Sequence, residues 1–131
     1  MQARVVLADC RVALEHAERA SDPAALRVAW AALVALLRTV GQVLDKVDGR
    51  QGEPLRRAID ARWRVWNANR ASNRAYWNFI EAERHAVLKV YDQAPAGGAA
   101  GPPRLDLAKS ALDWWAAELD AIEALAREQG A

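Results

Sequence analysis

The side chains best suited to chemistry lie in one stretch, residues 76–91. If this stretch is a helix, Arg84 falls on its apolar stripe, whereas Glu81, His85 and Lys89 follow one another along the adjoining face. A guanidinium directed at an apolar stripe requires a carboxylate, a subunit interface or an anionic ligand. One interpretation is therefore a site for an anion. In the other, the Arg84 stem covers apolar surface and its head pairs with Glu81, and the remaining polar side chains are solvated.

The run Phe-Ile-x-x-Glu-Arg-His-x-x-Leu-Lys-x-Tyr, from Phe79 to Tyr91, resembles the signature helix of HEPN-type helical-bundle proteins. In that family an Arg followed by a polar residue precedes a His by a few positions. The Arg and His of two subunits face each other across a dimer cleft and cleave RNA without a metal. Toxins of toxin-antitoxin pairs and phage-defence ribonucleases use this arrangement.

The resemblance implies that three residues form a catalytic set. Arg84 matches the Arg of the motif, His85 matches the polar residue after it, and Lys89 stands where the family has His. A Lys with a pKa near about 10.4 is a poor general base at neutral pH, although it can hold a phosphate or protonate a leaving oxygen. The resemblance therefore implies an RNA-associated, homodimeric protein that is a weak or inactive metal-independent ribonuclease.

A second stretch, from Arg62 to Arg74, places arginines among tryptophans and asparagines. Guanidinium groups contact phosphates through a planar fork and indoles stack on unpaired bases, so this composition suits RNA or single-stranded DNA. The predicted nucleic-acid contacts are Arg62, Arg64, Arg70 and Arg74. The alternative is that Trp63 and Trp66, which have helical core spacing, are buried and the arginines are their solvated neighbours.

A third feature is the adjacent pair Trp114 and Trp115. Trp115 lies on the apolar stripe of its predicted helix, and Trp114 is rotated from it by about 100°. An exposed Trp favours an interface with another chain. The alternative is a broad helix face that buries both indoles within one subunit.

The elements that must position these side chains are helices. Apolar residues recur at intervals of four and three over residues 26–47, which predicts one helix with this whole stripe buried. Asp22 is suited to cap its start and Pro23 to occupy its first position, and Gly49 and Gly52 end it.

The same rhythm from Ala3 to Ala17 predicts an earlier helix of about five turns, with Cys10 in the core. The first two helices should form a hairpin. Pro54 opens a third helix, whose predicted inward residues are Leu55, Ile59, Trp63 and Trp66. The asparagines and serine of residues 67–73 compete for backbone hydrogen bonds and predict a break.

A fourth helix is expected from about Arg74 to Asp92, and the Pro, Gly and Ala residues of 93–104 predict a flexible linker. The predicted stripe of the last helix is Leu105, Ala108, Leu112, Trp115, Leu119, Ile122 and Ala126. No segment alternates as a half-buried strand does. The predicted fold is therefore all-α, an antiparallel bundle of four to five helices that forms a single domain over residues 1–131.

The overall charge is balanced, but its distribution along the chain is not. The chain has 18 Lys and Arg against 17 Asp and Glu, a net charge of +1. Residues 50–91 hold nine basic and four acidic side chains, whereas residues 92–131 hold three basic and seven acidic ones. Such asymmetry suits a polyanion on one face, or an acidic helix packed beside a basic one.

Other features narrow the class of protein. The longest apolar run, Val28 to Leu37, is ten residues long and is bracketed by Arg27 and Arg38, so we expect no membrane partner. Near the N-terminus, Asp9 ends an apolar run far too short for a secretory segment, so we expect a cytoplasmic protein. Cys10 is the single cysteine and cannot form an internal disulfide. The sequence supplies no spacing for a metal site, and we expect no cofactor.

Two hypotheses follow from the sequence. In the first, the protein is HEPN-like, of toxin-antitoxin or phage-defence type, and acts on RNA. In the second, it is a non-catalytic helical module from a phage or accessory locus that oligomerises or binds a protein partner. Copies of Arg84 that face each other across a dimer groove would favour the first hypothesis, and Arg84 paired internally with Glu81 would favour the second.

Overall fold

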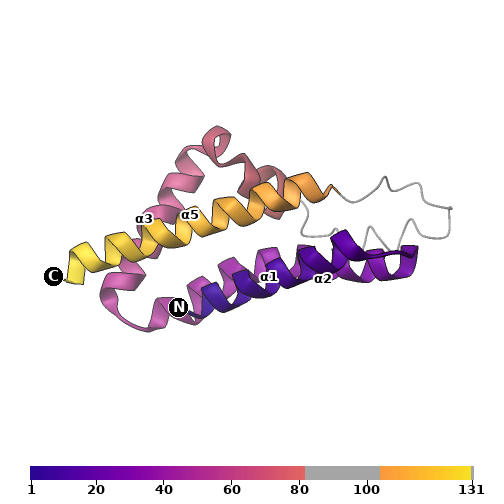
Figure 1. Cartoon of the computed structure of the whole chain (residues 1–131). Coiled ribbons are helices and arrows are strands. Elements are labelled where there is room, and N and C mark those ends of the chain that lie inside the picture. The colour runs from indigo at the N-terminus through magenta and orange to yellow at the C-terminus, as the bar shows by residue number, and fades with distance from the viewer. Residues whose placement is uncertain (82–103, 131) are drawn as a thin grey trace.

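The computed structural model describes residues 1–81 and 104–130, and these residues form an all-α helical bundle without a strand (Figure 1). The elements, in chain order, are α1 (Gln2–Arg19), α2 (Pro23–Lys46), the turn η1 (Asp48–Arg50), α3 (Glu53–Ala68), the turn η2 (Arg70–Asn73), the π-helical segment η3 (Ala75–Glu81) and α5 (Leu105–Gly130). The predicted fold class is confirmed. The expected helix beyond Glu81 and the expected linker at 93–104 lie outside the described residues, apart from Arg104.

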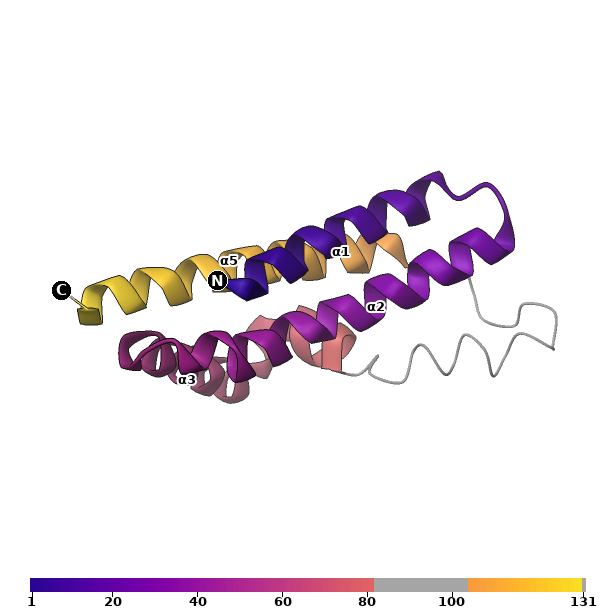
Figure 2. The same ribbon diagram turned by 90° about the horizontal axis from the view of Figure 1, so that it is seen from below.

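Helices α1 and α2 form the predicted hairpin and lie side by side along their lengths (Figure 2). The start of α2 is capped as its sequence predicts. The carboxylate of Asp22 accepts a hydrogen bond from the Ala25 amide at 2.9 Å, and Pro23 occupies the first turn. This bond satisfies one of the amide groups that a helix start leaves without an intrahelical partner.

The start of α1 is capped from a distant part of the chain. Asp48, in η1, is buried, and its two carboxylate oxygens accept hydrogen bonds from the amides of Gln2 and Ala3, each at 2.8 Å. A negative charge at a helix N-terminus is also favoured by the helix dipole. The turn after α2 therefore holds the first turn of α1 in place.

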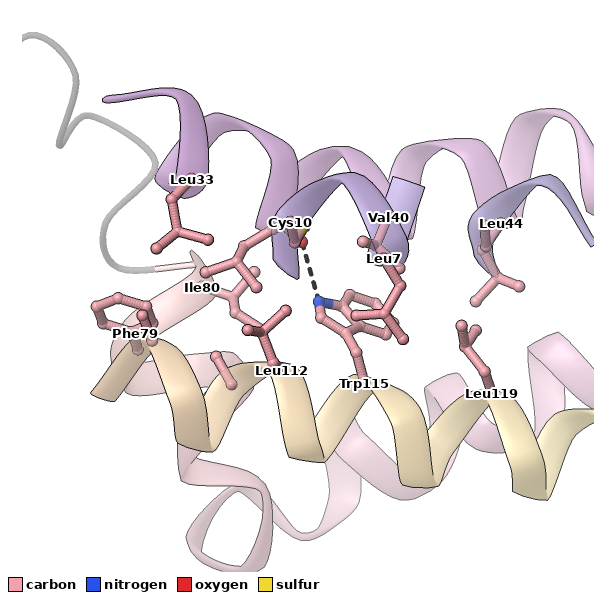
Figure 3. Close-up of a cluster of buried hydrophobic side chains, with 14 of the residues drawn as sticks. Leu7, Cys10, Leu33, Val40, Leu44, Phe79, Ile80, Leu112, Trp115 and Leu119 are labelled. Carbon is pink, nitrogen blue, oxygen red and sulfur yellow. Dashed lines mark hydrogen bonds between the residues drawn. The ribbon is translucent and has the colours of Figure 1, made fainter. Parts of the chain in front are cut away.

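The core lies between α5 and the hairpin, which run alongside each other (Figure 3). The α5 stripe is buried as predicted at its centre, from Ala108 to Ile122. The Trp115 indole is fully buried, and its Nε1 donates to the Leu37 carbonyl oxygen at 2.9 Å. Gly41 permits this approach, because a Cβ there would lie 3.2 Å from the Trp115 ring. Cys10 is buried as predicted, and desolvation raises the pKa of its thiol to about 12.

The prediction that the whole stripe over residues 26–47 is buried is wrong at its ends. Leu33, Leu37, Val40 and Leu44 are buried, whereas Leu26 and Trp30 are only partly so. Val47 is 41% exposed. The helix ends at Lys46, so that Val47 begins the turn into η1 and no longer follows the helical stripe.

Within the described residues, one segment is long and apolar enough to cross a membrane. It is Pro23–Arg50, and the mean hydropathy of its 18-residue window is 1.5. The central helix of a soluble protein meets the same criteria, and the middle of α2 supplies Leu33, Leu37 and Val40 to the core.

Candidate nucleic-acid interface

The two predicted sites have different outcomes. The predicted catalytic residues Arg84, His85 and Lys89 lie outside the described residues, so their arrangement stays a prediction. The stretch from Arg62 to Arg74 is described throughout. It forms the end of α3, the turn η2 and the start of the chain's return toward α5, and this corner stands beyond α5, on the side away from the α1–α2 hairpin (Figure 1).

The predicted break after the third helix is confirmed, and Asn73 fixes its shape. Helix α3 ends at Ala68, and Asn69 leaves the helical conformation with φ −125° and ψ 63°. The buried Asn73 side chain donates to the Asn69 carbonyl oxygen at 2.8 Å and accepts from the Trp114 indole at 3.0 Å. The sequence marked Asn73 as a turn former, but its bond to α5 spans 41 positions and could not be inferred from local spacing.

Six aromatic rings from α3, η3 and α5 pack against one another at this corner. Neighbouring centroids are 4.9 to 6.2 Å apart. The rings are those of Trp63, Trp66, Tyr76, Trp77, Trp114 and Trp115. Trp114 is half-buried among them, which agrees with the interpretation that both indoles of the pair are packed within one subunit.

The prediction that Trp63 points inward is wrong, because this residue is 44% exposed. Trp66 fills the buried position at this level of α3, with its indole bonded to α5. The ring of Trp63 meets those of Trp66 and Tyr76 at 84° and 87°, as an edge against a face. Contacts of this kind cover only part of an indole, and the remainder faces solvent.

The structure gives Arg62 a partner inside the protein. Its Nε and Nη2 donate to the two carboxylate oxygens of Glu118, at 2.7 and 3.1 Å. The Trp66 indole donates to the same carboxylate at 2.7 Å. Glu118 is only 8% exposed, so these three bonds satisfy a buried charge. Sequence reasoning missed Glu118, although a Glu three positions after Trp115 on an apolar stripe is a signal for a buried ion pair.

The other three predicted contacts, Arg64, Arg70 and Arg74, are exposed. Arg70 donates to the Asn67 side chain at 3.0 Å, and its guanidinium carbon lies 3.8 Å from the centroid of the Trp77 ring. This cation–π contact holds the head group without neutralising its charge. Asn67 follows Arg64 by three positions, so both side chains share one face of α3.

The nearest carboxylate along the helix pairs with Arg56 and not with Arg64. Asp60 lies one turn before Arg64, but its Oδ1 accepts from Arg56 at 2.8 Å. Within the part of the chain that the structure describes, neither Arg64 nor Arg74 forms an ion pair. The corner therefore carries positive charge that no described side chain compensates, next to a partly exposed indole. Phosphate oxygens and an unpaired base are the groups that this pair of features can bind.

Across residues 1–81 and 104–130, no group of three or more His, Cys, Asp or Glu side chains is placed to hold a metal ion. Comparison of the chain with models of protein families, with curated proteins and with solved structures found no match.

Proposed function

We propose that the protein binds single-stranded RNA through the basic corner, which we define as Trp63, Arg64, Arg70 and Arg74. The observation that supports this most is the partly exposed Trp63 indole beside arginines that lack a carboxylate partner among the described residues. Arginines neutralise phosphates whatever the sequence, and a tryptophan adds stacking that only an unpaired base can accept. Arg62 is not included, because it is bonded to Glu118.

The same proposal places the protein among HEPN-like, RNA-associated proteins of toxin-antitoxin or phage-defence type, acting in the cytoplasm as a homodimer. Its support is the resemblance of the run from Phe79 to Tyr91. In this proposal the basic corner holds the RNA, and Arg84, His85 and Lys89 form the groove floor at which a weak cleavage takes place. In this step the ribose 2′-hydroxyl would give its proton to water and bond to the adjacent phosphorus, and the bond from phosphorus to the 5′-oxygen of the next nucleotide would break. Arg84 would stabilise charge on the phosphate, and Lys89 would protonate the leaving oxygen.

Trp63→Leu is expected to weaken binding of a single-stranded RNA oligonucleotide by roughly 5- to 150-fold, because stacking of one base is worth about 1–3 kcal/mol. The measurement is fluorescence anisotropy of a labelled oligonucleotide at fixed, low salt. Trp63 is partly exposed, so the variant should fold. A duplex RNA of the same length is the control, since its bases are stacked already, and its affinity should change little. Equal losses for both forms, or no loss for either, would contradict stacking on Trp63.

The cleavage step has a separate test. Arg84→Ala is expected to abolish any cleavage of single-stranded RNA by the purified protein in the presence of a chelator. Lys89→His should increase cleavage, since an imidazole titrates near neutral pH and serves as a general base where an ammonium group does not. Gel analysis of an end-labelled RNA gives the readout. Cleavage that persists in Arg84→Ala, or no gain in Lys89→His, would contradict the proposed ribonuclease activity. The proposal of RNA binding would then rest on the binding measurements alone.

The second candidate function is the non-catalytic interaction module. An exposed apolar surface on the hairpin favours it. Val5, Val12 and Val28 are each more than half exposed, and a groove of about 850 Å³ lies between α1 and the first half of α2. Contiguous apolar surface of this kind marks contact sites for proteins. A protein that binds neither single-stranded nor duplex RNA at low salt would favour this function over the first.

A further inference from the structure

A pocket of about 290 Å³ opens between α2, α3, η3 and α5. Four aromatic side chains and a few apolar groups form its walls, and charged side chains stand among the lining residues. The aromatic residues are Trp63, Trp66, Tyr76 and Trp115. The charged residues are Asp45, Arg56 and Asp60. The volume is at the lower end of about 300–1,000 Å³ for ligand sites, so the pocket suits a compact ligand.

The rings that line the pocket stand in two nearly perpendicular orientations. Trp115 and Trp66 are buried, at 0% and 3% exposed, so the rings with surface open to the pocket are Trp63 and Tyr76. The planes of these two rings meet at 87°, with centroids 6.0 Å apart. The face of an aromatic ring carries negative electrostatic potential. Trp63 and Tyr76 can therefore present such potential to one bound group from two directions.

The charged groups give the pocket a negative balance. Arg56 bridges the two aspartates, with Nη2 at 2.9 Å from Asp45 Oδ1 and at 2.8 Å from Asp60 Oδ1. The hydrogen bond to Asp60 raises the pKa of the Arg56 guanidinium, which stays charged. One guanidinium thus compensates only one of two carboxylates. Each carboxylate uses Oδ1 in these bonds, which leaves Oδ2 to interact with a positive group.

We propose that this pocket binds a small organic cation of the quaternary-ammonium type. Aromatic walls attract such a cation through its charge, and they accept its apolar methyl groups, which form no hydrogen bonds. The carboxylates add long-range attraction, and they disfavour an anion. The proposal does not depend on RNA binding, because it rests on the interior of the pocket and on Asp45 and Asp60 rather than on the arginines of the basic corner.

The test is titration of the full chain with choline, followed by tryptophan fluorescence and by isothermal calorimetry. The neutral analogue 3,3-dimethyl-1-butanol, in which carbon replaces the charged nitrogen, is the matched ligand. We expect saturable binding of choline and at least about tenfold weaker binding of the analogue. Equal binding of the two ligands, or no saturable binding of choline up to about 10 mM, would overturn the proposal.

Two variants and one control locate the binding. Trp63→Leu should weaken choline binding roughly 2- to 30-fold by removing one ring, and Asp45→Asn should weaken it several-fold by removing one charge. Asp113→Asn, at an exposed position of α5 away from the pocket lining, should have no effect. Unchanged choline affinity in Asp45→Asn and Trp63→Leu would show that the cation binds elsewhere. Asp45→Asn should not weaken RNA binding, so failure of this proposal and failure of the RNA proposal are distinguishable.

Discussion

Glu118→Ala is expected to lower the free energy of unfolding by about 3 kcal/mol. Removing one partner of a buried ion pair costs about 3–5 kcal/mol, because the other charge remains buried without compensation. The lower end applies here, since the Arg62 side chain is 24% exposed and can recover some hydration. The Trp66 indole loses its acceptor as well. Urea denaturation followed by circular dichroism measures the change, and the melting temperature should fall by roughly 10 °C.

The control for this prediction is the double variant Glu118→Leu with Arg62→Leu. Replacing both partners by apolar residues removes the unpaired charge but leaves the Trp66 indole without its acceptor, so the double variant should recover about half of the loss and remain roughly 1–2 kcal/mol below the parent protein. A loss below about 0.5 kcal/mol in Glu118→Ala, or a double variant as unstable as the single one, would show that the pair does not stabilise the junction of α3 and α5.

The double variant also separates Arg62 from the RNA surface. If Arg62 is a structural residue, the double variant should bind single-stranded RNA with the affinity of the parent protein. If Arg62 instead contacts a phosphate, as its place among the arginines of this stretch predicts, the double variant should lose affinity. This comparison uses a folded protein in both cases, because the ion pair is replaced as a unit.

Replacing Arg64, Arg70 and Arg74 together by Gln is expected to weaken binding of single-stranded RNA on the order of 100-fold at low salt. Each lost phosphate contact forgoes the release of condensed counterions, and this release is most favourable when salt is low. Gln keeps a side chain of similar length at these exposed positions, so the stability should change little. Fluorescence anisotropy at about 50 mM salt gives the affinity.

The matched control replaces Arg11, Arg19 and Arg38 by Gln. These three residues are also exposed, they lie on α1 and α2, and they form no ion pair among the described residues. Both triple variants therefore have the same net charge and differ only in where the charge is lost. Equal losses of affinity in the two variants would mean that RNA responds to total charge and not to the basic corner.

Periodicity and capping predicted the helices well, because both depend on neighbouring residues. Asp22 and Pro23 determine the start of α2 through one turn of backbone. The same reasoning could not find Asp48, which caps α1 from 45 positions away. It also placed Trp63 inward, because a helical stripe gives the direction of a side chain but not the depth of the packing over it.

The sequence located the candidate site, but it did not show which of its arginines are exposed and which is paired inside the protein. The mixture of arginine and tryptophan residues between Arg62 and Arg74 predicted a basic surface, and the structure finds three of its four arginines exposed. The fourth, Arg62, lies on the face of α3 that meets α5, where it bonds to Glu118. A contact between residues 56 positions apart depends on how two helices pack, and no local pattern encodes that.

The most direct test of RNA binding at the basic corner is the dependence of affinity on salt, measured with single-stranded RNA. Three phosphate contacts predict a slope of about −2 for the logarithm of the affinity constant against the logarithm of the salt concentration. The variant without Arg64, Arg70 and Arg74 should show a clearly shallower slope, and the variant without Arg11, Arg19 and Arg38 should keep the slope of the parent protein. No binding by the parent protein at about 50 mM salt, or the same slope for all three proteins, would contradict the proposed function.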